Sequence, residues 1–181
     1  TMDVMLCGKD LVNYVERYLQ QPNQYIVPVH CWNKLYSRSI ILSNNIWFDR
    51  QLSQLEDVHF NFQYFKHCKS IFFHRAFGYY HRIDSEHSTM SAFAGTETNA
   101  VEKCVTAFGP IKLFLQHYNK FVDFDIPPAL GHHFMTTAII YVIRMSRRFL
   151  RRPNKQDYYN IRAWTTSLYV RDNIHYYKPK R

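Results

Sequence analysis

Glycine and acidic residues are both scarce in this sequence. Only 5 of the 181 residues are glycine. Sandwiches and barrels use glycine in their many turns, so this scarcity argues against them and favours helices. Neither a G-x-S-x-G elbow nor a glycine-rich phosphate loop occurs, and the acidic residues are few and scattered. We therefore expect no catalytic residues and no nucleotide-binding loop.

Paired cysteines are also missing. The four cysteines lie far apart, and none belongs to a C-x-x-C pair. They are Cys7, Cys31, Cys68 and Cys104. Each has apolar neighbours, so we expect buried, reduced thiols, as in intracellular proteins. The adjacent His132 and His133 would point about 100° apart on a helix and could not share an ion. We therefore predict no metal site.

Long hydrophobic runs are absent too. The most apolar stretch, 134–143, is far shorter than the roughly 20 residues of a membrane span, and no signal peptide is evident. We therefore expect a soluble protein without membrane contact. Apolar residues still make up 46% of the chain, which is enough for a sizeable core. We expect residues 1–181 to form a single domain, as a fragment of a longer protein.

Apolar spacings of three and four residues predict about six helices. We expect them at 6–19, 29–42, 57–77, 99–118, 127–152 and 154–169. The segment 78–98 has no such periodicity and is predicted to be a long loop. Residues 134–143 are apolar almost all round, so their helix is expected to lie at the centre of an all-α fold. No strand pair is predicted.

Capping residues and prolines set several of the expected helix ends. Asn99 and Asn154 are predicted N-caps, the second with Asp157 three residues later. The run Ile126-Pro127-Pro128 opens the fifth helix, with proline tolerated in the first turn. Pro110, which follows a glycine, is expected to kink or split its helix.

The chain has 23 Lys and Arg against 14 Asp and Glu, a formal net charge of +9. Part of this surplus is clustered in Arg144, Arg147, Arg148, Arg151, Arg152 and Lys155. Three interpretations remain open. The cluster complements the dipole of its own helix, contacts an acidic partner surface, or binds nucleic acid with a steep salt dependence.

A second candidate site combines aromatic and polar side chains. His133, Thr137 and Tyr141 follow one face of the helix predicted at 127–152, and Trp164 lies on the next helix. These four residues would line an apolar pocket for a small molecule, or they would pack as plain core. The sequence leaves both possibilities open.

One set of motifs resembles a known family. Residues 58–77 are similar to the helix ending in an HRPF-type motif in the regulatory region of fungal binuclear zinc-cluster transcription factors, with Ala76 in place of the usual proline. Residues 102–107 resemble the K-C-x-x-A helix start of that region, and residues 126–134 its proline-opened helix. Residues 163–179 resemble its later helix, which precedes a Y-x-P element.

This resemblance covers about residues 58–179 and implies an all-α, non-catalytic regulatory domain in the nucleus. Such a domain binds a small effector, forms a homodimer or contacts transcriptional coregulators. The six clustered cysteines of the zinc cluster are absent, so neither a cofactor nor direct DNA contact is expected from this chain. The alternative is a helical structural subunit of a large assembly, in the mitochondrion or the cytoplasm.

Overall fold

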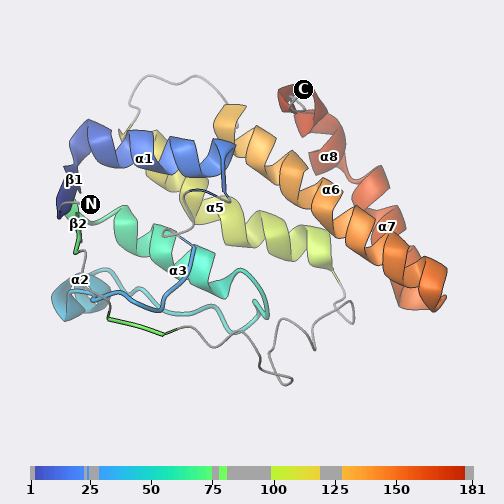
Figure 1. Ribbon diagram of the computed structural model, residues 1–181, viewed down its shortest axis with the longest axis horizontal. Helices are drawn as coiled ribbons and strands as arrows, with labels where there is room; N and C mark the ends of the chain where they lie inside the picture. The colour runs from blue at the N-terminus through green and yellow to red at the C-terminus, as the bar shows by residue number, and fades with distance from the viewer. Residues whose placement is uncertain are drawn as a thin grey trace. The chain divides into compact units, whose positions relative to one another are not determined.

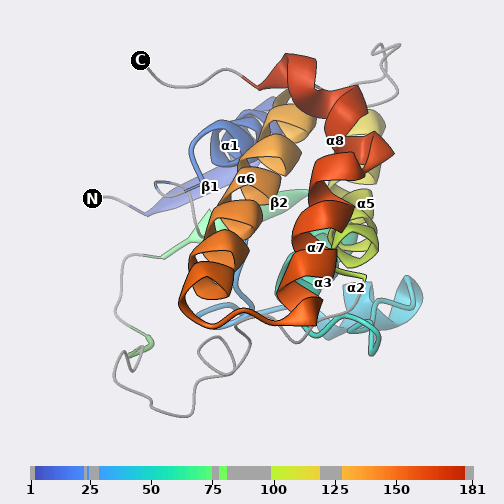
Figure 2. The ribbon, with the colours of Figure 1, turned by 90° about the vertical axis from the view of Figure 1, so that its right-hand side faces the viewer.

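The computed structural model describes residues 3–22, 24, 29–74, 78–80, 99–118 and 128–177 (Figures 1 and 2). These residues form seven α-helices and one small antiparallel sheet. The fold is therefore mostly helical but not strictly all-α. The chain divides into two compact units, which are described separately. Unit 1 comprises residues 1–80 and 103–130, and unit 2 comprises residues 81–102 and 131–181.

Unit 1 contains most of the early elements of the chain. They are β1 (Val4–Cys7), α1 (Gly8–Gln20), α2 (Arg38–Ser43), α3 (Glu56–Phe65), β2 (Ser70–Phe73) and all but the first turn of α5 (Ala100–Tyr118). Helix α1 confirms the first predicted helix, although it begins later because β1 precedes it. Its buried residues recur at spacings of three and four: Leu11, Val12, Val15, Tyr18 and Leu19.

The two-stranded sheet joins distant parts of unit 1. β1 pairs antiparallel with β2, with Val4 opposite Phe73 and Cys7 opposite Ser70. The predicted helix 57–77 is therefore wrong over residues 66–74, which follow the end of α3, and residues 75–77 lie outside the described residues. A strand of four residues has no periodicity of its own, and its partner lies far away in the sequence. Cys7 is exposed on β1, contrary to the buried thiol expected, whereas Cys68 and Cys104 are buried and Cys31 is half-buried.

The predicted helix 29–42 is also wrong over most of its length. Only α2 is helical, and residues 29–37 are irregular. The backbone N–H of Cys31 donates a hydrogen bond to Asp57 Oδ2 at 2.9 Å. The Tyr36 hydroxyl donates to Asn61 Oδ1 at 2.6 Å, and the Ser37 N–H donates to the Tyr64 hydroxyl at 2.7 Å. Because these bonds tie the segment to α3, they satisfy polar groups without a helix.

Aromatic rings fill the core of unit 1. Phe62 of α3 is fully buried, and its ring meets Phe114 of α5 edge-on with centroids 5.9 Å apart. The Tyr118 hydroxyl at the end of α5 donates to the carbonyl of Cys68 at 2.8 Å. Helix α5 is continuous through Pro110, so of the two predicted outcomes the split does not occur and the kink stays a prediction. Asn99 has a φ of 60°, not the extended backbone typical of an N-cap, and its capping role stays a prediction.

Unit 2 contains the C-terminal helices. They are α6 (Pro128–Arg151), whose first turn belongs to unit 1, α7 (Lys155–Thr166), α8 (Leu168–Asn173) and the 3-10 helix η1 (Ile174–Tyr176). Pro128 is the first residue of α6, and the Asn154 side chain accepts the Asp157 N–H, so both predicted helix starts are confirmed. The last predicted helix breaks at Ser167, which caps α8. Leu168 and Tyr169, which follow this break, are exposed.

The end of unit 2 packs against the start of α6. A Cβ added to Gly131 would overlap Tyr176 Cδ2 and would lie 2.9 Å from Asn173 Oδ1. One residue later, the ring of His132 stacks on Tyr177 with centroids 5.7 Å apart. Position 131 therefore admits only glycine without a shift of its neighbours. Of the predicted loop 78–98, residues 81–98 lie outside the described residues, and residues 78–80 are irregular.

Candidate partner-binding surface

One side of α6 faces α7. The rings of Phe134 and Tyr141 lie 5.9 and 5.6 Å from Trp164, and Arg148 forms an ion pair with Asp157. The three α6 residues are seven apart and therefore share one side of the helix. Since Trp164 meets the earlier residues and Asp157 the later one, α7 runs antiparallel to α6, as Figures 1 and 2 show.

The four residues of the predicted pocket lie in or near this packed side. Trp164 is 1% exposed and stacks on Tyr141 with an angle of 12° between their planes. His133 is buried, and Thr137 is half-buried. Stacking of this kind is what plain core packing requires. That the four residues admit a small molecule stays a prediction.

Among the basic residues predicted to contact a partner, Arg148 differs because it is bound to a buried carboxylate within the protein. It donates from Nε to Asp157 Oδ2 at 2.7 Å and from Nη2 to Asp157 Oδ1. Asp157 is fully buried and also accepts a hydrogen bond from the Asn154 amide at 2.5 Å. Burial lowers the pKa of Arg148. This bidentate pair fixes the corner between α6 and α7, so it leaves Arg148 little freedom to bind a partner.

The other predicted arginines lie on exposed parts of α6 or just after it, and exposed aliphatic side chains accompany them. Ile140, Ile143 and Leu150 are 43%, 44% and 81% exposed. We define the cationic stripe as Ile140, Ile143, Arg144, Arg147, Leu150 and Arg151. Their spacings of three and four residues place them on one side of α6. Arg152 is exposed just beyond the helix.

The stripe points away from α7. At 100° per residue, Arg147 is turned by 100° from Arg148, and Leu150 by 200°. Residues 134–143 were expected to place their helix at the centre of the fold, but a central position is not shown, and Ile140 and Ile143 are exposed. The exposure of Ile140 and Ile143 was not predicted from the sequence. The signal was detectable, because Ile140, Ile143 and Leu150 alternate with arginines at spacings of three and four residues.

Positive charge is concentrated in this part of the chain. Residues 131–177 contain eight Lys and Arg against two acids, a balance of +6 within the total of +9. One acid, Asp157, is buried against Arg148, and the other, Asp172, lies 3.5 Å from Arg171. Within the described ranges, Arg144, Arg147 and Arg151 form no ion pair. The stripe therefore offers three guanidinium groups to an external anion.

No family model, curated protein or solved structure matches this chain. Across the described parts of the chain, no helix is long and apolar enough to cross a membrane, and no three His, Cys, Asp or Glu side chains gather to hold a metal ion. The half-buried Cys31 thiol has its pKa raised to about 12, mainly by burial. A thiol with so high a pKa is a poor nucleophile at neutral pH. The cationic stripe is thus the strongest functional feature of unit 2.

Proposed function

We propose that this chain is a non-catalytic regulatory domain, of the fungal transcription-factor type it resembles, that binds an acidic amphipathic helix of a partner protein. One observation carries the proposal: exposed arginines and branched aliphatic residues alternate along one side of α6. In a transcription factor the partner would be a coregulator, and the complex would form in the nucleus.

A helix of matching pattern fits both components of the stripe. Carboxylates accept paired hydrogen bonds from guanidinium groups, and apolar partner side chains would cover Ile140, Ile143 and Leu150. From Ile140 to Arg151 the stripe is about 16 Å long, at 1.5 Å per residue. A partner helix of about three turns, with acids and large aliphatic residues on one face, would span this length.

The same alternation of arginines and aliphatic residues disfavours nucleic acid and anionic membranes as partners. Nucleic acids bind through phosphate contacts to cationic and polar groups, which give no role to exposed isoleucine and leucine. Around the helix, Arg147 lies between Ile140 and Ile143, at 100° per residue. A membrane that received both isoleucines would therefore have to bury the guanidinium between them, which is costly. An acidic helix would bury the isoleucines and neutralise Arg147 together.

The test is a titration of the chain against a fluorescently labelled 14-residue peptide with Glu and Leu on one helical face. We expect Arg147→Glu to weaken binding by roughly tenfold or more, because it replaces attraction by repulsion, and Leu150→Ser by roughly threefold. Arg162→Glu is the matched control, since it removes an exposed arginine of α7 outside the stripe. It should change the affinity by less than about threefold.

Two further probes separate the partner classes. Duplex DNA and vesicles containing phosphatidylserine are titrated under the same salt conditions. Tighter binding to either probe than to the peptide, with loss in Arg147→Glu, would assign the stripe to nucleic acid or membrane and contradict the proposal. Equal effects of Arg147→Glu and Arg162→Glu would show that net charge alone matters.

A structural subunit of a larger assembly is the second candidate. Exposed apolar side chains in unit 1 favour it, among them Leu35, fully exposed, and Met5, Trp47 and Phe72, each more than half exposed. Such a subunit should aggregate when purified alone. A monomeric chain with a cooperative thermal transition would argue against this alternative.

A further inference from the structure

The outward side of α7 combines tyrosine rings with positive charge. The buried residues of this helix are Asp157, Asn160 and Trp164. At about 100° per residue, Arg162 points about 160° away from Trp164, and Tyr159 about 140° away. We define the tyrosine face as Lys155, Tyr158, Tyr159 and Arg162, all of which are exposed. It is separate from the cationic stripe, which lies on α6.

Both positive charges of the tyrosine face are free to bind an anion. Lys155 and Arg162 lie seven residues apart, about 10 Å along the axis, with Tyr159 between them. Neither cationic side chain forms an ion pair or a hydrogen bond with any described residue. Asp157, the one acid in the sequence of α7, is buried against Arg148. The face therefore offers an ammonium group and a guanidinium group, one on each side of an aromatic ring.

The two tyrosine rings are in contact with each other but remain largely uncovered. Their centroids lie 5.7 Å apart, with 66° between the ring planes. Such an edge-on contact leaves at least one face of each ring open. Tyr158 is 52% exposed and Tyr159 is 58% exposed, so these open faces reach solvent. A flat aromatic ligand can therefore stack on either ring.

We propose that the tyrosine face binds single-stranded nucleic acid. One base stacks on Tyr159, and the phosphates on its two sides pair with Lys155 and Arg162. Stacking of this kind accepts any base, because every base has a flat π surface. The site lies outside the cationic stripe and does not depend on the partner proposed for that stripe.

Two other partners fit the tyrosine face less well. In a duplex the bases are stacked on one another, so a double strand could use the two cations but not the rings. An amphipathic protein helix would bring apolar side chains to the face. The tyrosine face contains no branched aliphatic residue to meet them, unlike the cationic stripe with Ile140, Ile143 and Leu150.

The first experiment titrates labelled strands of about 12 nucleotides with the whole chain and follows fluorescence anisotropy at low salt. The probes are oligothymidylate, oligouridylate and an abasic strand with the same number of phosphates. We expect both strands with bases to bind roughly tenfold tighter than the abasic strand, because only they can stack on Tyr159. The tighter of the two identifies DNA or RNA as the source of the strand. An abasic strand that binds equally well would overturn the stacking, and absence of binding at about 100 µM chain would overturn the site.

Two substitutions of Tyr159 test the ring directly. Tyr159→Ala should weaken the binding of oligothymidylate roughly tenfold, whereas Tyr159→Phe should stay within about threefold, because phenylalanine keeps the flat ring. Equal losses in the two variants would contradict stacking. The acidic peptide described above is the second probe. If Tyr159→Ala weakens the binding of the peptide more than that of the strand, the face belongs to a protein partner and the proposal fails.

Salt dependence tests the phosphate contacts. Two contacts to a single strand give a slope of about −1.4 in a plot of log K against log salt concentration, and Arg162→Gln should reduce the slope to about −0.7. Arg147→Gln is the matched control, since it removes the same charge from the cationic stripe. It should leave the slope and the affinity nearly unchanged. Equal changes in both variants would show that net charge alone attracts the strand and would overturn the site.

Discussion

The two units hold their buried aromatic side chains in different ways. In unit 1, polar contacts connect the rings to the backbone and to one another, as in the bond from Tyr36 to the fully buried Asn61. In unit 2, Trp164 is fixed by stacking alone, since its buried Nε1 has no hydrogen-bond partner among the described residues. In unit 1 the rings near α3 are therefore held partly by directed polar bonds. In unit 2 the position of Trp164 depends on how well the neighbouring rings fit, and the polar pair of Arg148 and Asp157 acts farther along the same two helices.

This difference determines what a substitution should cost in each unit. A change of shape should be most damaging around Trp164, where the fit between rings provides the stability. Loss of a single oxygen should matter more in unit 1, because its irregular segment has few other constraints. Three substitutions test this contrast.

The largest effect is expected from Trp164→Ala. It empties the space between Phe134 and Tyr141, and we expect the free energy of unfolding to fall by about 3–5 kcal/mol. Trp164→Phe should cost only about 1–2 kcal/mol, because it loses volume but breaks no hydrogen bond. Urea denaturation of both variants measures the two losses. Equal losses in the two variants would mean that the indole nitrogen has a stabilising partner, and the contrast between the units would disappear.

An intermediate effect is expected from Gly131→Ala. The new methyl group collides with Tyr176 and Asn173, and we expect a loss of about 1–3 kcal/mol. Gly109→Ala on α5 is the matched control, because no atom lies within 4 Å of its added Cβ apart from its own helix and chain neighbours. Its gain in helix propensity is opposed by the restriction that Pro110 places on the preceding residue, so the change should stay below about 1 kcal/mol.

Thermal unfolding of Gly131→Ala and Gly109→Ala separates the collision at residue 131 from the effect that any glycine-to-alanine change has on a helix. If Gly131→Ala melts at the wild-type temperature, η1 does not pack on the start of α6 in solution.

The smallest effect is expected from Tyr36→Phe in unit 1. The substitution removes one hydrogen bond to the buried Asn61, and we expect a loss of about 0.5–1.5 kcal/mol. Tyr159→Phe removes a hydroxyl from an exposed ring of α7 and should change stability by less than about 0.5 kcal/mol. Chemical denaturation of both variants provides the comparison. Equal losses would show that the bond from Tyr36 to Asn61 adds nothing to the stability of unit 1.

The sequence predicts the helix boundaries of unit 2 better than those of unit 1, because they depend on residues close together in the chain. Helices α6 and α7 begin where Pro128 and Asn154 place them, because capping and proline chemistry act within one turn. The irregular segment 29–37 could not be predicted. Its geometry depends on Asp57, Asn61 and Tyr64, which lie more than 20 residues away. Apolar periodicity carries no information about such bonds.

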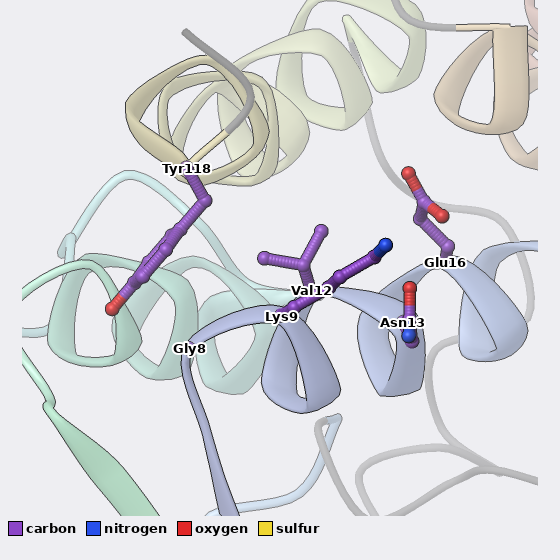
Figure 3. A pocket seen from close by; sticks show the side chains of 6 residues that line it. All are labelled: Gly8, Lys9, Val12, Asn13, Glu16 and Tyr118. Atoms are coloured by element: carbon purple, nitrogen blue, oxygen red, sulfur yellow. The ribbon is translucent and has the colours of Figure 1, made fainter.

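The candidate sites show the same limit. The positions of the basic residues were evident from the sequence, but the removal of Arg148 from the exposed set required its buried partner Asp157. The hollow between α1 and the end of α5, lined by Val12 and Tyr118 among others (Figure 3), could not be predicted either, because its walls come from two helices far apart in the sequence.

The pairing of β1 with β2 also affects how the chain is made. Val4–Cys7 leaves the ribosome long before Ser70–Phe73, its partner. At about 5–20 residues per second, the first strand waits roughly 3–13 s with its backbone groups unpaired. Its apolar side chains and open edge are then a template for wrong pairing between nascent chains. Translation of Ser70–Phe73 ends this interval, because β2 then pairs one edge of the first strand.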